Sequence, residues 1–137
     1  MTDKVVKFNL AGVTFDGRQG ILKKLALING PRNIDITFTH EFDNKFDSNA
    51  ILAEVVINGE EFAVGYIPKT LAKSFATVIT SSLKNNDAYH AMNRDDKLNY
   101  VKTHFTDLTG YGIAAAHVVG GGYAGMSYGL EIILVKM

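Results

Sequence analysis

The sequence predicts a strand-rich α+β domain: a small barrel of about six mainly antiparallel strands with two or three helices. Some segments alternate apolar and polar residues as strands do, and others repeat apolar residues at helical spacing. The two kinds do not alternate regularly along the chain, as they would in a parallel sheet. A closed or partly open barrel is favoured because closure removes exposed strand edges. With 137 residues, we expect a single domain over 1–137.

The N-terminal part predicts one strand and one helix. Apolar side chains recur along residues 4–15, which favours a strand with Gly12 as a bulge or a point of close approach. Asp16 and Gly17 then end this strand. Residues 17–27 place their apolar side chains on one helical face and both lysines on the other, so a short helix is expected.

The next segments predict three strands. Residues 34–39 alternate apolar and polar side chains, as in a half-buried strand with one face in water. Two further apolar runs, 51–57 and 62–67, flank Asn58 and Gly59. Because this dipeptide suits a tight type I′ turn, the two runs are predicted to form a β-hairpin.

The rest of the chain predicts helices and then a closing pair of strands. Residues 68–83 repeat apolar side chains at helical spacing. The segment 84–110 is polar and turn-rich at first, and an amphipathic helix is expected around 94–107. Two strands, 111–120 and 128–136, follow with a glycine-rich loop between them.

Composition limits the function. Fourteen basic and fourteen acidic side chains cancel, which argues against a protein that coats duplex DNA through its phosphates. Recognition of a nucleic-acid end remains open. Cysteine is absent, and no apolar run approaches the roughly 20 residues that span a bilayer. We therefore expect a soluble, cytoplasmic protein that does not bind a membrane.

The sequence shows no catalytic or metal-binding constellation. The glycine cluster 120–122 lacks the Lys and Ser/Thr that end a phosphate-binding loop. Asp95 and Asp96 lie in a polar stretch typical of a solvated face. The histidines are scattered without ligand spacing: His40, His90, His104 and His117. We expect no enzyme activity, no cofactor and no bound metal.

The loop 43–51 is the strongest candidate site. It places Phe46 beside Asp47, between two predicted strands. An aromatic ring can stack on a flat ligand while the carboxylate accepts a hydrogen bond. In the alternative interpretation Phe46 packs into the core, and Asp47 and Asn49 only shape the turn. Both roles can coexist.

Three motifs occur in an order and at a spacing that resemble one family. They are Gly12-Val13-Thr14-Phe15-Asp16-Gly17-Arg18-Gln19, Asp43-Asn44-Lys45-Phe46-Asp47-Ser48-Asn49-Ala50-Ile51 and Val64-Gly65-Tyr66-Ile67-Pro68-Lys69-Thr70-Leu71-Ala72. The closing Gly129-Leu130-Glu131-Ile132 is similar to that family's last strand. The chain thus resembles a HIRAN domain over about residues 5–83 and 112–136. The segment at about 84–110 is longer than the family needs.

The resemblance implies both a fold and a function. HIRAN domains occur in eukaryotic fork-remodelling DNA translocases and as stand-alone bacterial or phage proteins. Their fold is a modified OB-like barrel, and the eukaryotic members capture the 3′-hydroxyl end of single-stranded DNA. The resemblance therefore implies a DNA-binding module of DNA repair, without catalysis of its own. Its partners would be single-stranded DNA 3′ ends and a DNA-processing protein.

The family also implies roles for three residues of the first two motifs. Phe15 and Phe46 would stack on the terminal bases, each such contact being worth about 1–3 kcal/mol. Asp47 would accept a hydrogen bond from the 3′-hydroxyl. A 3′-phosphate would be rejected, because it would bring like charges together.

Further residues are assigned by the same resemblance. The hydroxyl of Tyr66 would reach phosphate or sugar, and Met126 would close the pocket with an apolar contact. Arg18 and Lys69 are the candidates for phosphate pairing. Thr14 stands where translocase-linked members carry a cation before the aromatic residue.

Two other functions remain open from the sequence. The first is a protein-interaction or structural adaptor on the same barrel, which the zero net charge and the missing cation favour. The second is a nuclease-like enzyme, which would need a cluster of acids around a metal. Salt-sensitive binding of short single strands, tight binding of a protein, and metal-dependent cleavage distinguish the three functions.

Overall fold

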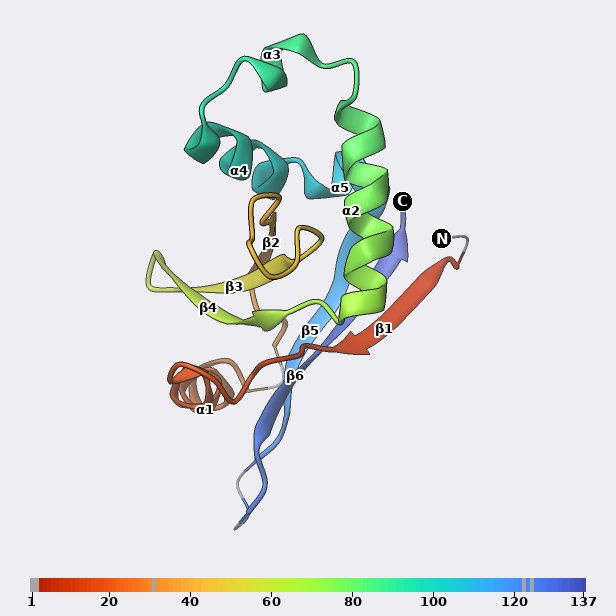
Figure 1. Ribbon diagram of the computed structural model, residues 1–137. Helices are drawn as coiled ribbons and strands as arrows, with labels where there is room; N and C mark the ends of the chain where they lie inside the picture. The colour runs from red at the N-terminus through yellow and green to blue at the C-terminus, as the bar shows by residue number, and fades with distance from the viewer. Residues whose placement is uncertain (1–2, 31, 122, 124) are drawn as a thin grey trace.

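The computed structural model describes residues 3–30, 32–121, 123 and 125–137, which form six strands in two antiparallel sheets and five helices (Figure 1). The first sheet has the order β1-β6-β5 and the second the order β2-β3-β4. The α+β prediction is confirmed. The strands are β1 (Val5–Asn9), β2 (Ile36–His40), β3 (Ile51–Ile57), β4 (Glu60–Tyr66), β5 (Tyr111–Gly120) and β6 (Tyr128–Lys136).

Of the two expected forms, a closed or a partly open barrel, the closed one is not found in the described part of the chain, because the strands pair as two separate sheets. Backbone hydrogen bonds join the two sheets at two places. Ala11, just beyond β1, forms an antiparallel bridge with Tyr66 at the end of β4, with N–O distances of 2.8 and 2.9 Å. On the other side, the amide of Ile34 donates to the carbonyl of Ala116 in β5 at 3.0 Å.

The hairpin predicted at Asn58 and Gly59 is confirmed. Both residues have positive φ, 52° and 80°, as the two central residues of a type I′ turn require. The flanking strands β3 and β4 pair from Leu52 with Tyr66 to Ile57 with Glu60. The predicted closing strands are also confirmed: β5 and β6 keep the expected bounds and pair along most of their length.

The first predicted strand is too long, because β1 ends at Asn9 rather than at residue 15. Left-handed backbone angles at Gly12, Asp16 and Gly17 turn the chain into a loop. Thr14 and Phe15 therefore lie in this loop and not in a strand. The helix expected over 17–27 is present as α1 (Arg18–Asn29).

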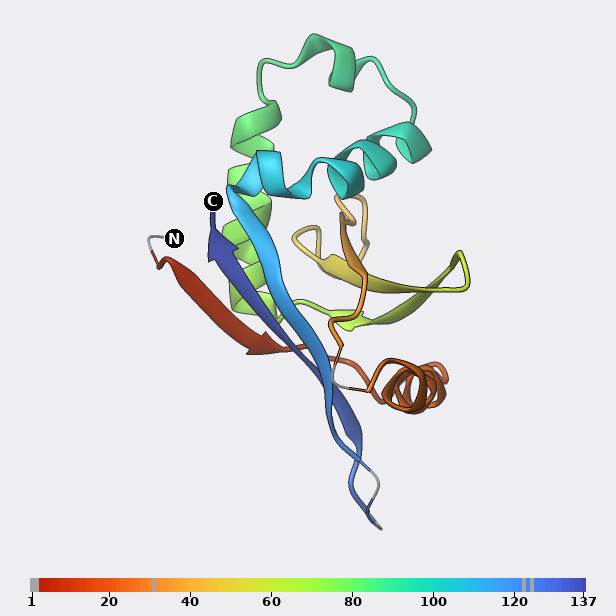
Figure 2. The same cartoon turned by 180° about the vertical axis from the view of Figure 1, so that it is seen from behind.

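The segment 84–110 forms an arch of helices over one end of the molecule (Figures 1 and 2). It follows α2 (Lys69–Leu83), which was predicted to within one residue. The helix expected over 94–107 is divided at His104, so that two shorter helices replace it. The helices of the arch are α3 (Asp87–His90), α4 (Arg94–Thr103) and α5 (Phe105–Thr109).

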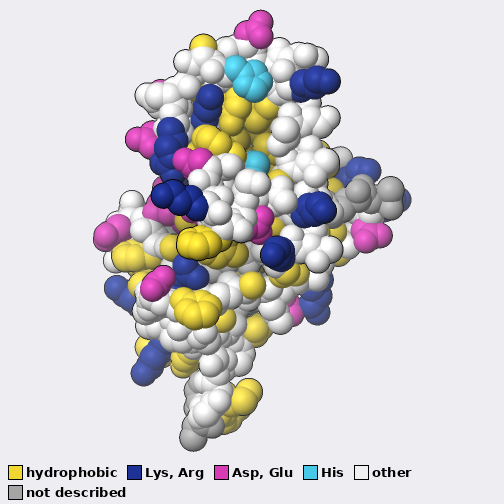
Figure 3. Space-filling model, viewed as in Figure 1, with side chains coloured by type: hydrophobic (Ala, Val, Ile, Leu, Met, Phe, Trp, Pro, Cys, Tyr) yellow, Lys and Arg dark blue, Asp and Glu magenta, His cyan; other side chains and the backbone are white. Residues whose placement is uncertain are grey.

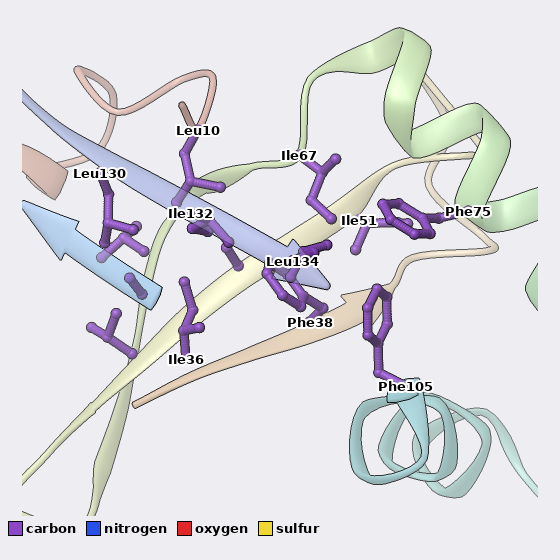
Figure 4. Close-up of a cluster of buried hydrophobic side chains, with 14 of the residues drawn as sticks. Leu10, Ile36, Phe38, Ile51, Ile67, Phe75, Phe105, Leu130, Ile132 and Leu134 are labelled. Carbon is purple, nitrogen blue, oxygen red and sulfur yellow. The ribbon is translucent and has the colours of Figure 1, made fainter. Parts of the chain in front are cut away.

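The hydrophobic core lies between the two sheets and extends under α2 and α5. Leu130, Ile132 and Leu134 of β6 face side chains of the second sheet (Figure 4). Phe105, at the start of α5, packs on Phe38 of β2. The arch is therefore part of the core rather than an appendage. Among the helices in the described ranges, none has both the length and the apolar character needed to cross a membrane.

Candidate functional site

A hollow of about 440 Å³ lies between the loop that follows β2 and the junction of β4 with α2. The second and third sequence motifs meet here, and the chain just before the first motif contributes Ala11. Phe46, Asp47, Tyr66 and Lys69, four of the predicted site residues, are among its walls. The lining residues are Ala11, Asn44, Phe46, Asp47, Ala50, Tyr66, Ile67 and Lys69.

Short side-chain-to-backbone hydrogen bonds shape the loop. The side-chain oxygen of Asn44 accepts the amides of Phe46 and Asp47 at 2.9 and 3.1 Å. One carboxylate oxygen of Asp47 accepts the amide of Asn49 at 2.9 Å. These bonds hold the loop in a turn that directs Phe46 into solvent, where its side chain is 99% exposed. Phe46 is therefore not a core residue, whereas Asp47 does shape the turn.

His40 holds the loop 43–51 through a hydrogen bond from the protein interior. It is buried at the end of β2, and its Nε2 lies 2.8 Å from the carbonyl oxygen of Ser48. Because a carbonyl only accepts, Nε2 carries the proton and the ring fixes the end of the loop. Burial lowers the pKa of His40, against the smaller opposing effects of Ser48 and Asp47. The neutral ring is thus the form that the fold favours.

An ion pair ties the loop to the arch. Arg94, the first residue of α4, donates to the carboxylate of Asp43, and this hydrogen bond lowers the pKa of Asp43. Both side chains are substantially exposed, so the pair adds little stability. It gives the segment 84–110 a contact with the loop of the candidate site.

Tyr66 forms the back wall of the hollow. Its hydroxyl donates to Glu41 Oε1 at 2.8 Å, and Asn44 donates to the same oxygen at 3.1 Å. Burial, followed by the bond to Glu41, raises the pKa of Tyr66. Because its proton is engaged, the Tyr66 hydroxyl can offer a ligand only an acceptor. Of the two contacts predicted for this hydroxyl, phosphate or sugar, an acceptor suits a sugar hydroxyl. Sequence reasoning missed Glu41, since its partner lies 25 positions along the chain.

Arg18, from the first motif, contacts the Tyr66 ring at the back of the hollow. Its Nη1 donates to the carbonyl of Gly12 at 2.7 Å, and its guanidinium carbon lies 5.5 Å from the centre of the Tyr66 ring. Its Nε is buried and has no hydrogen-bond partner among the described residues. Arg18 therefore stands against Tyr66 as a cation–π partner, without lining the hollow itself.

The remaining predicted residues do not line the hollow. Thr14 and Phe15 lie in the loop between β1 and α1, where the Phe15 ring is 64% exposed. Gln19 fastens this loop by donating to the carbonyls of Val13 and Tyr128 at 2.9 and 2.8 Å. Met126 lies in the connection of β5 with β6, at the end where these two strands extend away from the rest of the chain (Figures 1 and 2).

Gly65 permits a close approach between β4 and the chain that follows β1. A Cβ atom at this position would lie 2.6 Å from the carbonyl oxygen of Ala11, a backbone atom that cannot swing away. We expect Gly65→Ala to lower the free energy of unfolding by about 1–3 kcal/mol, because the bridge between the sheets must open. Chemical denaturation measures this.

The matched control for that variant is Gly20→Ala in α1. A Cβ atom at Gly20 would have no neighbour within 4 Å, so alanine there should be neutral or stabilise the helix by up to about 1 kcal/mol. Equal stability of the two variants would show that the junction tolerates a side chain at Gly65.

In comparisons with known proteins, no family model, no curated protein and no solved structure matches this chain. Within the described ranges, no three His, Cys, Asp or Glu side chains gather as metal ligands would. The residues at the site supply an exposed aromatic ring, hydrogen-bond acceptors and nearby cations. Lys and Arg side chains lie among exposed hydrophobic ones on this face (Figure 3).

Proposed function

We propose that this chain is a HIRAN-type module that binds the 3′-hydroxyl end of single-stranded DNA in the hollow beside Phe46, without catalysis of its own. The observation that carries the proposal is the almost complete exposure of Phe46 at the wall of a hollow that also contains Asp47. The Asn44 side chain accepts two backbone amides and so directs the Phe46 ring into water, where it contributes nothing to the core. The ring is available for a flat partner, and a nucleobase is one.

Each residue of the hollow has a role in this proposal. Phe46 stacks on a base, and the Asp47 carboxylate accepts the hydrogen bond of the 3′-hydroxyl. One of its oxygens already holds the turn, but a carboxylate offers about four lone-pair positions. The oxygen of Tyr66 is an alternative acceptor for the same hydroxyl, which has one proton to donate. Lys69 meets the adjacent phosphate, and Arg18 adds positive charge behind Tyr66.

The remaining predicted contacts belong to the same proposal. Phe15 is exposed in the neighbouring loop and stacks on a second base, with Thr14 beside it. Met126 meets the DNA only if the strand extends to the β5–β6 hairpin. We further propose that the two sheets form an open OB-like barrel. The bridge of Ala11 with Tyr66 and the bond of Ile34 to Ala116 support this, since they join the sheets on both sides.

Asp47→Asn tests the proposed role of the carboxylate. Asparagine keeps an oxygen that can accept the Asn49 amide but loses the charge. We expect wild type to bind a strand with a 3′-hydroxyl at least about tenfold more tightly than one with a 3′-phosphate, a difference of about 1.4 kcal/mol. In Asp47→Asn the two affinities should converge. Fluorescence anisotropy with 5′-labelled oligonucleotides measures both.

The result that opposes this role is equal binding of both ends by wild type, or a preference that survives in Asp47→Asn. Thermal unfolding of the variant is the control, because the turn should be intact. The second candidate function is a protein-interaction adaptor, which the zero net charge favours. It predicts that no oligonucleotide binds even at low salt.

A further inference from the structure

The outward face of α2 carries a row of cations and hydroxyls. Lys69, Lys73, Thr77, Ser81 and Lys84 follow one another at steps of four, four, four and three residues, and all five are exposed. Residues at this spacing lie on one side of a helix, about 6 Å apart along its axis. The row therefore runs the length of α2 and one residue beyond it.

No negative charge interrupts this part of the chain. Between Glu61 and Asp87 there is no acidic residue, whereas three lysines occur. The ion pairs found within the described ranges involve other side chains, so these lysines are not neutralised by a neighbour there. A protein without net charge thus has one locally positive helix.

Two further hollows adjoin the C-terminal half of this row. One, of about 630 Å³, is lined by Thr77, Ser81 and Lys84 of the row together with Asn49. The other, of about 240 Å³, includes Lys97 and a floor of apolar and aromatic side chains. They share Thr80 and His90, and no carboxylate lines either of them. Figure 3 shows hydrophobic and histidine side chains in a depression on this part of the face.

The first hollow and these two are neighbours. The loop that carries Phe46 separates them: Asp47 and Ala50 line the first hollow, and Asn49 lines the second. Helix α2 borders both, with Lys69 at the first and Thr77 at the second. A chain molecule that passes from the first hollow to the second therefore runs alongside the row on α2.

We propose that the sugar–phosphate backbone of a bound single strand runs along this row from Lys69 to Lys84, with its 5′ side in the hollow beside His90. This inference rests on the proposed function and adds the direction and length of the bound strand. Lys73 and Lys84 contact phosphates, and the hydroxyls of Thr77 and Ser81 donate to them. Helix α2, with 15 residues, is about 22 Å long, which accommodates about four nucleotides, the lower limit for related single-strand sites.

The test compares a dinucleotide with an octanucleotide, both thymidylates with a free 3′-hydroxyl, on the full chain. The variant is Lys73→Gln/Lys84→Gln. The control is Lys23→Gln/Lys24→Gln, which removes two exposed charges from α1. We expect wild type to bind the octanucleotide at least about tenfold more tightly than the dinucleotide. The variant should lose this gain while its affinity for the dinucleotide stays unchanged.

The salt dependence of octanucleotide binding is a second test of the phosphate contacts. Each lost phosphate contact reduces the steepness of the fall of log K with log salt by about 0.7 on a single strand, so the slope of the variant should be less negative by about 1.4 and that of the control unchanged. If variant and control bind the octanucleotide alike, the row is not a phosphate path, and a preference of wild type for the 3′-hydroxyl over the 3′-phosphate would still support end capture. If the variant loses octanucleotide binding while the 3′-phosphate makes no difference to wild type, the row binds phosphates but end capture and the proposed strand direction fail. If no oligonucleotide binds wild type at low salt, both proposals fail.

Discussion

Phe105→Ala is expected to lower the free energy of unfolding by about 3–5 kcal/mol, the usual cost of removing a buried phenylalanine. The centre of the Phe105 ring lies 5.0 Å from that of Phe38 and 5.6 Å from that of Phe75 (Figure 4). The Phe75 ring in turn lies 5.6 Å from that of Tyr111. Truncation leaves a cavity where β2, α2 and the arch meet. Urea unfolding followed by circular dichroism measures the loss.

Phe46→Ala is the matched control for stability. It removes the same atoms from a ring that is almost fully exposed, so the change should stay within about 0.5 kcal/mol. If Phe105→Ala costs no more than Phe46→Ala, the segment 84–110 does not contribute to the core as described here.

The same Phe46→Ala variant should weaken binding of single-stranded DNA by about 1–3 kcal/mol, or roughly 5-fold to 150-fold. The reason is the lost stacking of one base, since the ring makes no contribution to the fold that could be lost instead. Anisotropy titration with a short strand carrying a free 3′-hydroxyl measures the change. Phe46→Trp should retain the affinity, because a larger π-face replaces the ring.

Tyr123→Ala controls for a general effect of exposed aromatic residues. Tyr123 is 77% exposed in the β5–β6 connection and does not line the hollow. Its removal should leave the affinity for a short strand unchanged. An equal loss in Tyr123→Ala and Phe46→Ala would mean that the strand does not select the hollow.

Most strands could be predicted because local chemistry alone determines them. Asn58 and Gly59 require one kind of turn, and β5 and β6 are long apolar runs. The error in the first strand has a local cause as well: its apolar pattern continues past Asn9, but left-handed angles at Gly12 turn the backbone. The separation into two sheets depends on pairing between distant segments, which periodicity does not reveal.

The candidate site, like the fold, was predicted only in part. The gathering of Phe46, Asp47, Tyr66 and Lys69 was expected from motifs, and the structure brings these four together. The engagement of the Tyr66 proton by Glu41 could not be foreseen, because it depends on how a loop after β2 faces the end of β4. The positive row on α2 was not predicted. The sequence does contain a stretch without acidic residues there, but a net charge of zero for the whole chain gives no sign of it.

The most direct measurement of end capture compares a linear single strand with a circular one of the same sequence and length, at the same low salt. The circle offers every base and phosphate of the linear strand but no 3′-hydroxyl. We expect the linear strand to bind at least about tenfold more tightly, a difference of about 1.4 kcal/mol. Equal affinity would contradict end capture and leave the hollow without the role proposed for Asp47.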